Sequence, residues 1–131
     1  VVGIPGRIDA HDGRVIISSK PIYGGSKDVG KLIIKCMNVN PRDRSVASIK
    51  YDSKVEHALK ELNIHYIKVG PHESSNEDDV INAVVNSMIK DPALEAVVDL
   101  GGYALEPVTY VFGIDSIDVA LKVIKIASRA N

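Results

Sequence analysis

The chain has 131 residues, of which 45% are hydrophobic and 25% charged, values typical of one soluble globular domain with a real core. Sixteen basic residues against seventeen acidic ones leave a formal charge of -1, so net charge gives no argument for binding nucleic acid or a membrane. No apolar run reaches the roughly 18 residues of a membrane span, and the single cysteine excludes an internal disulfide, which favours a cytoplasmic setting. Because the first residue is Val1 rather than methionine, we expect residues 1–131 to be one domain and the C-terminal part of a longer protein.

The chain opens with a predicted β-hairpin. Two β-prone runs, at residues 7–10 and 14–18, flank His11-Asp12-Gly13. An Asp-Gly pair between such runs is typical of a tight hairpin turn. The hairpin makes a purely parallel sheet an unfavoured arrangement for this domain.

A glycine turn then leads into the first helix. Gly24 and Gly25 precede Ser26, which suits an N-cap, and the apolar positions that follow repeat with the helical period. These positions are Val29, Leu32, Ile33, Cys36 and Met37. A glycine turn at a helix N-terminus presents backbone N–H groups and the positive end of the helix dipole, which suit a phosphate. An ordinary helix start stays open as the alternative, because many helices begin in this way.

This turn does not match the phosphate loop of nucleotide triphosphatases. The spacing from Gly25 to Gly30 and Lys31 imitates that loop, but Leu32 replaces the hydroxyl residue that binds magnesium. Gly30 also falls inside the helical stripe rather than in a loop. We therefore exclude a nucleotide triphosphatase.

Strand and helix patterns alternate along the rest of the chain. Strands are expected at residues 46–51, 64–69, 96–100 and 108–112, and helices at 53–62, 81–88 and 115–127. The run 96–100 is continuously apolar, which is typical of a central strand. This alternation predicts an α/β fold, a single layered domain with a mixed sheet, helices packed on it and the N-terminal hairpin.

Two of these helices carry recognisable caps. Ser53 and Glu56 have the spacing of a capping box, and Asp115 suits the N-cap of the last helix. Apolar residues spread widely around that last helix, so we expect it to be broadly buried. They are Ile117, Val119, Ala120, Leu121, Val123, Ile124, Ile126 and Ala127.

The titratable residues form no catalytic triad. The histidines His11, His57, His65 and His72 fall in a turn, on the polar side of a helix, in a strand and in a loop, where solvated or structural roles are the common ones. The carboxylates of segment 71–79 precede a helix and complement its dipole, an interpretation that we prefer to a metal site.

A second glycine turn, Gly101-Gly102, follows the predicted central strand. In α/β sheets, ligands bind at the carboxyl ends of strands, so both glycine turns are candidates for lining a site. The charged residues near the two turns in sequence are Arg7, Lys20, Lys27, Asp28, Lys31, Asp99 and Glu106. Basic groups suit phosphate, and carboxylates suit a divalent metal held between phosphate and protein.

Short segments that span nearly the whole chain carry a family resemblance. They are Gly3-Ile4-Pro5-Gly6-Arg7-Ile8, Tyr23-Gly24-Gly25-Ser26-Lys27-Asp28-Val29, Asn40-Pro41 through Arg44 to Ile49-Lys50-Tyr51, and Asp99-Leu100-Gly101-Gly102 followed by Glu106-Pro107. In this order they resemble the archaeal ThiN-type thiamine-phosphate synthase domain. In that family the domain often follows a pyrimidine kinase domain, and in other members a related domain follows a helix-turn-helix and senses thiamine phosphates.

The resemblance implies a transfer reaction. Hydroxymethylpyrimidine diphosphate loses diphosphate while the nitrogen of a thiazole phosphate bonds to the pyrimidine methylene, giving thiamine phosphate. Arg7 matches the functional arginine of the family, and the residues implied in binding substrate or phosphate are Gly24, Gly25, Ser26, Lys27, Gly101, Gly102 and Glu106.

The same resemblance sets expectations for cofactors and partners. Mg²⁺ is expected to accompany the diphosphate, and the ligands are phosphorylated pyrimidine and thiazole compounds or thiamine phosphate. We expect a fused upstream kinase or helix-turn-helix domain, and neither a membrane nor nucleic acid as a partner of this domain. A homodimer stays open.

Two residues depart from the family pattern. Asp28, the second catalytic candidate, stands where the family has a histidine, and Leu105 replaces a lysine before Glu106. An ionised Asp28 repels a leaving diphosphate, although it also stabilises the helix start by about 0.3–1 kcal/mol or binds a metal ion. Both changes weaken a site that expels diphosphate more than a site that holds a product. Enzyme and ligand-sensing regulatory domain therefore both stay open, with a structural or interaction module as the third alternative.

Overall fold

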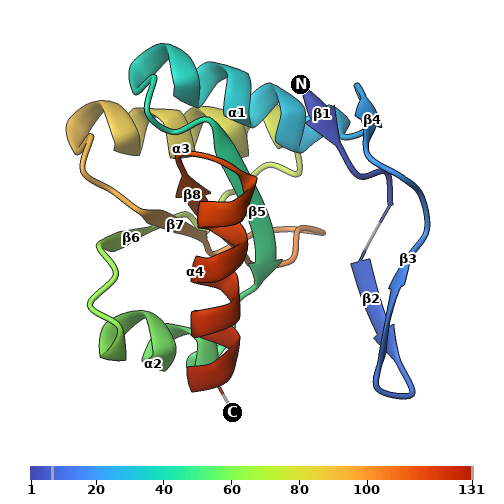
Figure 1. The fold of residues 1–131 in the computed structure, drawn as a ribbon. Helices are drawn as coiled ribbons and strands as arrows, with labels where there is room; N and C mark the ends of the chain where they lie inside the picture. The colour runs from blue at the N-terminus through green and yellow to red at the C-terminus, as the bar shows by residue number, and fades with distance from the viewer. Residues whose placement is uncertain (7, 131) are drawn as a thin grey trace.

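Four helices cover both faces of a four-stranded sheet in the computed structural model, which describes residues 1–6 and 8–130 (Figure 1). The strands of this sheet are β5 (Ser45–Lys50), β6 (Tyr66–Val69), β7 (Ala96–Asp99) and β8 (Val108–Gly113). The helices are α1 (Lys27–Val39), α2 (Ser53–Glu61), α3 (Glu77–Lys90) and α4 (Ser116–Arg129). None of the helices in the described ranges is long and apolar enough to cross a lipid bilayer. The predicted layered α/β domain is confirmed.

The sheet is mixed because β8 runs against its neighbours. The strand order is β5-β8-β7-β6, with β8 antiparallel to β5 and β7, and β6 parallel to β7. Val108 at the start of β8 pairs with both Lys50 and Asp99, and Asp99 pairs with Val69. The carboxyl ends of β5, β6 and β7 therefore meet the beginning of β8 at one edge of the sheet. We call it the carboxyl edge.

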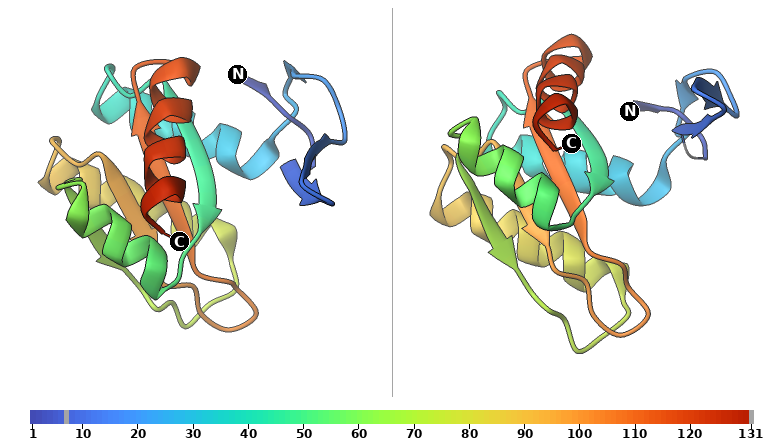
Figure 2. Two further views of the ribbon diagram at one scale, coloured as in Figure 1. Left: turned by 60° about the horizontal axis from the view of Figure 1, so that its bottom comes forward. Right: turned by 90° about the horizontal axis from the view of Figure 1, so that it is seen from below.

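Helices α1 and α3 pack side by side on one face of the sheet, and α2 and α4 cover the other (Figures 1 and 2). The core under α1 and α3 contains Leu32, Ile33, Cys36, Ile81, Val84, Met88, Leu94, Val97 and Phe112. The core under α2 and α4 contains Val55, Ala58, Leu59, Val98, Val111 and Ile126. Because side chains alternate along a strand, Asp99 shares the side of Val97 and lies toward the starts of α1 and α3.

The first part of the chain forms a separate arm. Strand β1 (Val2–Gly3) pairs with β4 (Ile22–Tyr23), and β2 (Ile8–His11) pairs with β3 (Arg14–Ile17) in the hairpin predicted around Asp12 and Gly13. Neither pair joins the main sheet. Figures 1 and 2 show the arm standing beside the layered body rather than inside it.

The predicted capping box of α2 is wrong by one residue. Asp52, not Ser53, is the N-cap, and its carboxylate accepts a hydrogen bond from the Val55 N–H at 2.8 Å. Glu56 does not reach back to the cap, because its carboxylate accepts hydrogen bonds from Tyr66 at 3.0 Å and Lys68 at 2.6 Å. A carboxylate directly before the helix takes the cap position that the hydroxyl residue was expected to hold.

The prediction of a broadly buried α4 is also wrong. Val119 and Ile126 are buried against the sheet, but Ile117, Leu121 and Ile124 are exposed. The sheet and α2 cover one side of α4 only, so half of its wide apolar arc faces outward. We call Ile117, Leu121 and Ile124 the outer stripe of α4.

Candidate functional site

A cavity of about 240 Å³ lies at the carboxyl edge of the sheet. It lies between the first turn of α3, the end of β7, the beginning of β8 and the loop 100–107. Its lining residues are Glu77, Val80, Asp99, Ala104, Leu105, Glu106, Val108 and Tyr110. The position is the one at which α/β sheets bind ligands, because the loops that follow parallel strands converge there.

Carboxylates dominate the electrostatics of this cavity. Burial raises the pKa of Glu77 above its ordinary value of 4.5, and the neighbouring charges of Asp28 and Asp99 raise it further. Burial, followed by the charges of Asp99, Glu77 and Asp28, raises the pKa of Tyr110 to about 12. The starts of α1 and α3 thus bring Asp28 into one electrostatic group with Glu77, Asp99 and Tyr110.

Asp99 is held in place by His72 and by the second glycine turn. The His72 Nε2 and Asp99 Oδ1 atoms are 2.6 Å apart, and the same oxygen accepts a hydrogen bond from the Gly101 N–H at 3.2 Å. The backbone of His72 donates to the Gly101 carbonyl at 2.7 Å, which ties loop 70–76 to loop 100–107. Asp99 therefore enters the cavity with its orientation determined on two sides.

The second glycine turn is shaped by close packing. Gly101 has a φ of +75°, which favours glycine, and a Cβ on Gly102 would collide with the backbone carbonyl of His72. The N–H groups of both glycines are used inside the protein, toward Asp99 and the Leu105 carbonyl. Their contribution to the site is thus the shape of the loop that carries Leu105 and Glu106.

The first glycine turn joins the arm to α1. The Gly24 N–H donates to the Val1 carbonyl at 2.9 Å and the Gly25 N–H to the Ile22 carbonyl at 3.2 Å, so both are already paired. Gly25 packs so closely on the Gly3 carbonyl that a side chain would collide with it. Ser26 occupies the predicted N-cap position of α1 but makes no side-chain cap hydrogen bond, so no side chain at that position competes for the first turn.

The structure brings some predicted site residues together and not others. Glu106 lines the cavity, and Asp28 acts on it through its charge. The first glycine turn and Lys27 do not line the cavity, and the prediction for Arg7 lies outside the described residues. Two further residues, Glu77 and Tyr110, were missed because the sequence assigns one to the helix dipole and the other to a strand.

His72 was also missed as a residue of the site. The sequence places it in a loop, where solvated or structural roles are the common ones, and its side chain is only 12% exposed and faces a carboxylate that is 4% exposed. Its position directly after Gly70-Pro71, which ends β6 at the carboxyl edge, is the signal that would have identified it. Of the solvated and structural roles that the sequence left for His72, the buried contact with Asp99 is the structural one.

Among the residues that the structure describes, the lining of the cavity combines three carboxylates and a phenol with apolar side chains and contains neither lysine nor arginine. Such a surface attracts a positively charged group or a hydrogen-bond donor and repels a free anion. No three His, Cys, Asp or Glu side chains of the described ranges are placed to hold a metal ion together.

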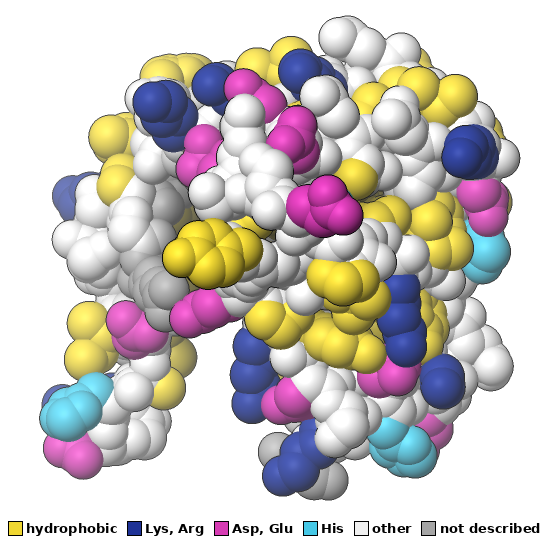
Figure 3. All heavy atoms as spheres, turned by 180° about the vertical axis from the view of Figure 1, so that it is seen from behind, with side chains coloured by type: hydrophobic (Ala, Val, Ile, Leu, Met, Phe, Trp, Pro, Cys, Tyr) yellow, Lys and Arg dark blue, Asp and Glu magenta, His cyan; other side chains and the backbone are white. Residues whose placement is uncertain are grey.

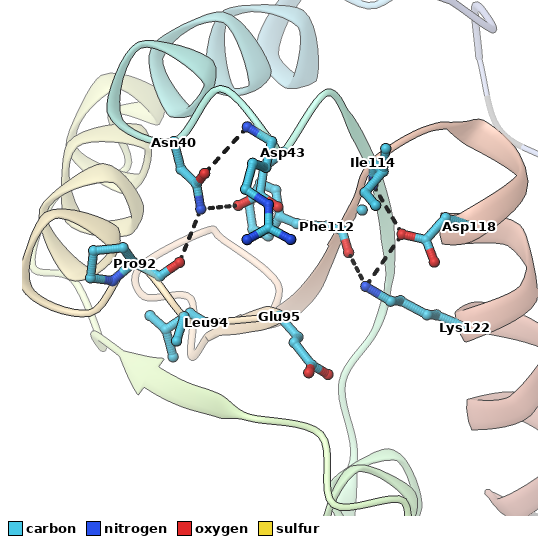
Figure 4. Close-up of a pocket in the computed structure, with 12 residues that line it drawn as sticks. Asn40, Asp43, Pro92, Leu94, Glu95, Phe112, Ile114, Asp118 and Lys122 are labelled. Atoms are coloured by element: carbon cyan, nitrogen blue, oxygen red, sulfur yellow. Dashed lines mark hydrogen bonds and ion pairs between the residues drawn. The ribbon is translucent and has the colours of Figure 1, made fainter.

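A second cavity, of about 430 Å³, lies at the opposite edge of the sheet (Figure 4). Several of its polar groups bind one another or the backbone. The Asn40 amide reaches Asp43 at 3.3 Å and the Pro92 carbonyl at 3.0 Å, and Lys122 lies between the Phe112 carbonyl at 2.9 Å and Asp118 at 3.5 Å. This network connects the end of α1 with the end of α3, and we interpret it as structural.

Comparison with known proteins identifies a matching family. The sequence profile of the family "Thiamine-phosphate synthase ThiN" matches residues 1–125. The chain is 27% identical over 139 aligned residues to "Thiamine-phosphate synthase ThiN" of Methanothermobacter thermautotrophicus, covering 98% of this chain and 72% of that protein.

Two solved structures share the fold. The C-terminal domain of protein MJ0236 has a TM-score of 0.79 at 26% identity, covering 97% of this chain and 71% of that one. The C-terminal domain of phosphomethylpyrimidine kinase has a TM-score of 0.74 at 20% identity, covering 95% of this chain and 74% of that one. With the profile match over almost its entire length, the chain belongs to the ThiN thiamine-phosphate synthase family.

Proposed function

We propose that this domain joins hydroxymethylpyrimidine diphosphate and thiazole phosphate to give thiamine phosphate and diphosphate. The observation that carries the proposal is the acidic cavity at the carboxyl edge, with Asp99 oriented inside it by His72 and Gly101. Family membership supplies the reaction class, and the cavity supplies a surface suited to the charge that this reaction develops.

The reaction moves positive charge onto the joined heterocycles. The thiazole nitrogen attacks the pyrimidine methylene carbon, the C–N bond forms as the C–O bond to diphosphate breaks, and the bonding electrons leave with the diphosphate. The product carries a permanently positive thiazolium ring. Asp99 and Glu106 face this charge as it develops, and preoriented groups of opposite sign stabilise such a transition state more than water does.

The diphosphate needs a different environment from the rings. The first turn of α1, without a side-chain cap, and Lys27 offer backbone N–H groups and a positive charge near the acidic cavity. Mg²⁺ enters with the diphosphate as part of the substrate, since it binds phosphate oxygens with only one or two protein carboxylates. We assign that contact to Asp28, next to Lys27.

A ligand-sensing domain is the second candidate, favoured by two residues. Asp28 adds a negative charge to the group formed by Glu77 and Asp99, and Leu105 lines the cavity where the family has a lysine. Asp28 repels a departing diphosphate, and Leu105 lacks the cation that would attract it. Neither interferes with holding the positively charged thiazolium ring of thiamine phosphate.

One experiment separates the two candidates. The domain is incubated with both phosphorylated precursors and Mg²⁺, thiamine phosphate is measured by chromatography, and its binding to the domain is measured by calorimetry. Multiple turnovers support the synthase. Tight binding of thiamine phosphate without any product overturns the synthase in favour of the sensor, and absence of both overturns the two candidates together.

Variants locate the activity at the cavity. Asp99→Asn keeps the size of the side chain and removes its charge, so we expect product formation to fall about tenfold to a hundredfold. Asp79→Asn is the matched control, because Asp79 is exposed in the first turn of α3 and does not line the cavity. Equal activity of the two variants would place the reaction elsewhere.

A further inference from the structure

The N-terminal hairpin has one apolar face and one polar face. In its register Ile8 pairs with Ile17 and Ala10 with Val15, and paired residues of neighbouring strands point to the same side. The alternate pairs place Asp9, Ile16, His11 and Arg14 on the other side. We call Ile8, Ala10, Val15 and Ile17 the apolar face of the hairpin.

This apolar face lacks a cover within the described part of the chain. Every residue of β2 and β3 is exposed, and the side chain of Val15 reaches an exposed fraction of 71%. Seen from behind, the hairpin forms a separate lobe at the lower left, with an open hollow between it and the body (Figure 3). A two-stranded hairpin alone is at most marginally stable in water, so this one needs a surface to pack against.

A surface of the same character lies on α4. The outer stripe repeats at helical spacing and, with Ile114 just before the helix, presents a continuous aliphatic row. Ile117 is 70% exposed and Ile124 is 62% exposed, whereas Val119 and Ile126 on the same helix are buried. A contiguous aliphatic row of this kind is a candidate contact surface.

We propose that two copies of this chain form a symmetric dimer in which the apolar face of each hairpin packs on the outer stripe of the partner's α4. One chain carries both halves of the contact, so a two-fold axis satisfies both surfaces at once, as in other isologous dimers. Neither surface is then left in water.

The apolar area available distinguishes this reciprocal packing from a dimer held by two hairpin faces alone or by two outer stripes alone. Ile8, Val15, Ile17, Ile114, Ile117, Leu121 and Ile124 are between 54% and 71% exposed. At about 60–120 Å² for a fully buried aliphatic side chain, they offer about 400 Å² of apolar surface per chain.

Both copies together then contribute about 800 Å² of apolar surface, which corresponds to a total interface of about 1,200 Å² at the usual apolar share. That reaches the range of stable interfaces. Contact between two hairpin faces alone, or between two outer stripes alone, offers less than half of this area. Reciprocal packing of hairpin on helix is therefore the arrangement with sufficient area.

Light scattering after gel filtration tests the proposal across a dilution series. We expect the wild type at twice the chain mass of 14.1 kDa, and the variants Val15→Ser/Ile17→Ser and Leu121→Ser/Ile124→Ser each at the single chain mass. Two controls should remain dimeric. Ile16→Ser changes the polar side of the same hairpin, and Ile34→Ser/Ile89→Ser removes two equally exposed isoleucines from α1 and α3, on the other face of the sheet.

A cross-linking measurement tests the pairing itself. Chains with Val15→Cys are mixed with chains carrying Leu121→Cys and treated with a bismaleimide, while the native Cys36 is buried and does not compete. We expect a cross-linked pair in the mixture and little in either variant alone.

Three results would overturn the proposal. The first is a wild type that is monomeric at every concentration. The second is a dimer that persists in both double variants with unchanged circular dichroism. The third is a dimer that dissociates to monomers in the hairpin variant, while the mixture of cysteine variants gives no cross-link. The last of these outcomes would assign the hairpin to another surface. None of them bears on the synthase reaction, so this proposal and the proposed function fail independently.

Discussion

The imidazole of His72 and the carboxylate of Asp99 lie 2.6 Å apart, from Nε2 to Oδ1, although 27 residues separate them in the chain. Both side chains are almost completely buried at the carboxyl edge of the sheet. The contact connects the loop after β6 to the end of β7, and it orients the carboxylate that we place beneath the reacting rings.

Removing the imidazole should destabilise the fold. His72→Ala leaves the buried Asp99 without its side-chain partner, so we expect a loss of about 1–3 kcal/mol in the free energy of unfolding, measured with urea. His65→Ala is the matched control. His65 also contacts a carboxylate, that of Asp91, but both side chains are partly exposed, and we expect a loss below about 1 kcal/mol. Equal losses would show that the His72 contact has no special weight.

The charge of Asp28 should be detectable at Glu77. Burial is the first cause of the raised pKa of Glu77 and Asp28 is the next, so Asp28→Asn should move that pKa toward its ordinary value of 4.5. Carboxyl-carbon nuclear magnetic resonance across a pH titration measures the shift. Asp78→Asn, in the same first turn as Glu77, serves as the control for a nearby carboxylate. If the pKa of Glu77 is unchanged in Asp28→Asn, Asp28 on α1 does not interact electrostatically with Glu77.

Glu77 should also make stability depend on pH. Its pKa is higher in the folded state than the ordinary value of 4.5, so the folded state holds the proton more tightly and stability falls as pH rises from 4.5 through the raised pKa. Glu77→Gln removes this titrating group, so the stability of the variant should fall less than that of the wild type over the same pH range. Urea midpoints measured below pH 4.5 and at neutral pH test it, with Asp79→Asn as the control. A parallel decline in wild type and Glu77→Gln would contradict the prediction.

Tyr110 should ionise late. Burial and the charges of Asp99, Glu77 and Asp28 raise its pKa to about 12 from an ordinary value of 10.0, so its phenolate forms only at strongly alkaline pH. Tyr110→Phe should remove a late step from the ultraviolet titration of the tyrosines. Tyr103→Phe, at an exposed side chain, should leave that step in place. A late step that survives in Tyr110→Phe would belong to another tyrosine.

The two candidate caps of α2 can be distinguished by substitution. Asp52→Ala removes the hydrogen bond to the Val55 N–H and should cost about 1 kcal/mol of stability, measured by urea unfolding. Ser53→Ala changes the residue that the sequence pattern favoured. It should cause no loss of stability, because Ser53 lies inside the helix, where alanine is at least as favourable as serine. A larger loss of stability in Ser53→Ala than in Asp52→Ala would show that Ser53 is the N-cap, as the capping-box pattern predicted.

Local patterns were sufficient for the elements of the fold. The helical stripe after Gly25 predicted α1, and the apolar run 96–100 predicted the central strand β7, because both depend on neighbours a few residues away. The same reasoning failed for α4. Its apolar residues surround the helix, and the sequence cannot tell which half the sheet covers. The hairpin was predicted, but not that it stays outside the main sheet.

The sequence by itself determined the elements, their order and the family, since helix and strand periods and short motifs are local properties of the chain. Only the tertiary structure decided how the candidate site is composed. The mixed sheet aligns the end of β7 with the starts of α1 and α3, and so brings Asp99, Glu77, His72 and Tyr110 into one group from four separate segments. Burial then changes the pKa values of Glu77 and Tyr110, and burial depends on contacts between residues that are distant in sequence. The exposure of the hairpin and of the outer stripe follows from the same cause, because which apolar faces remain uncovered is decided by how the layers pack.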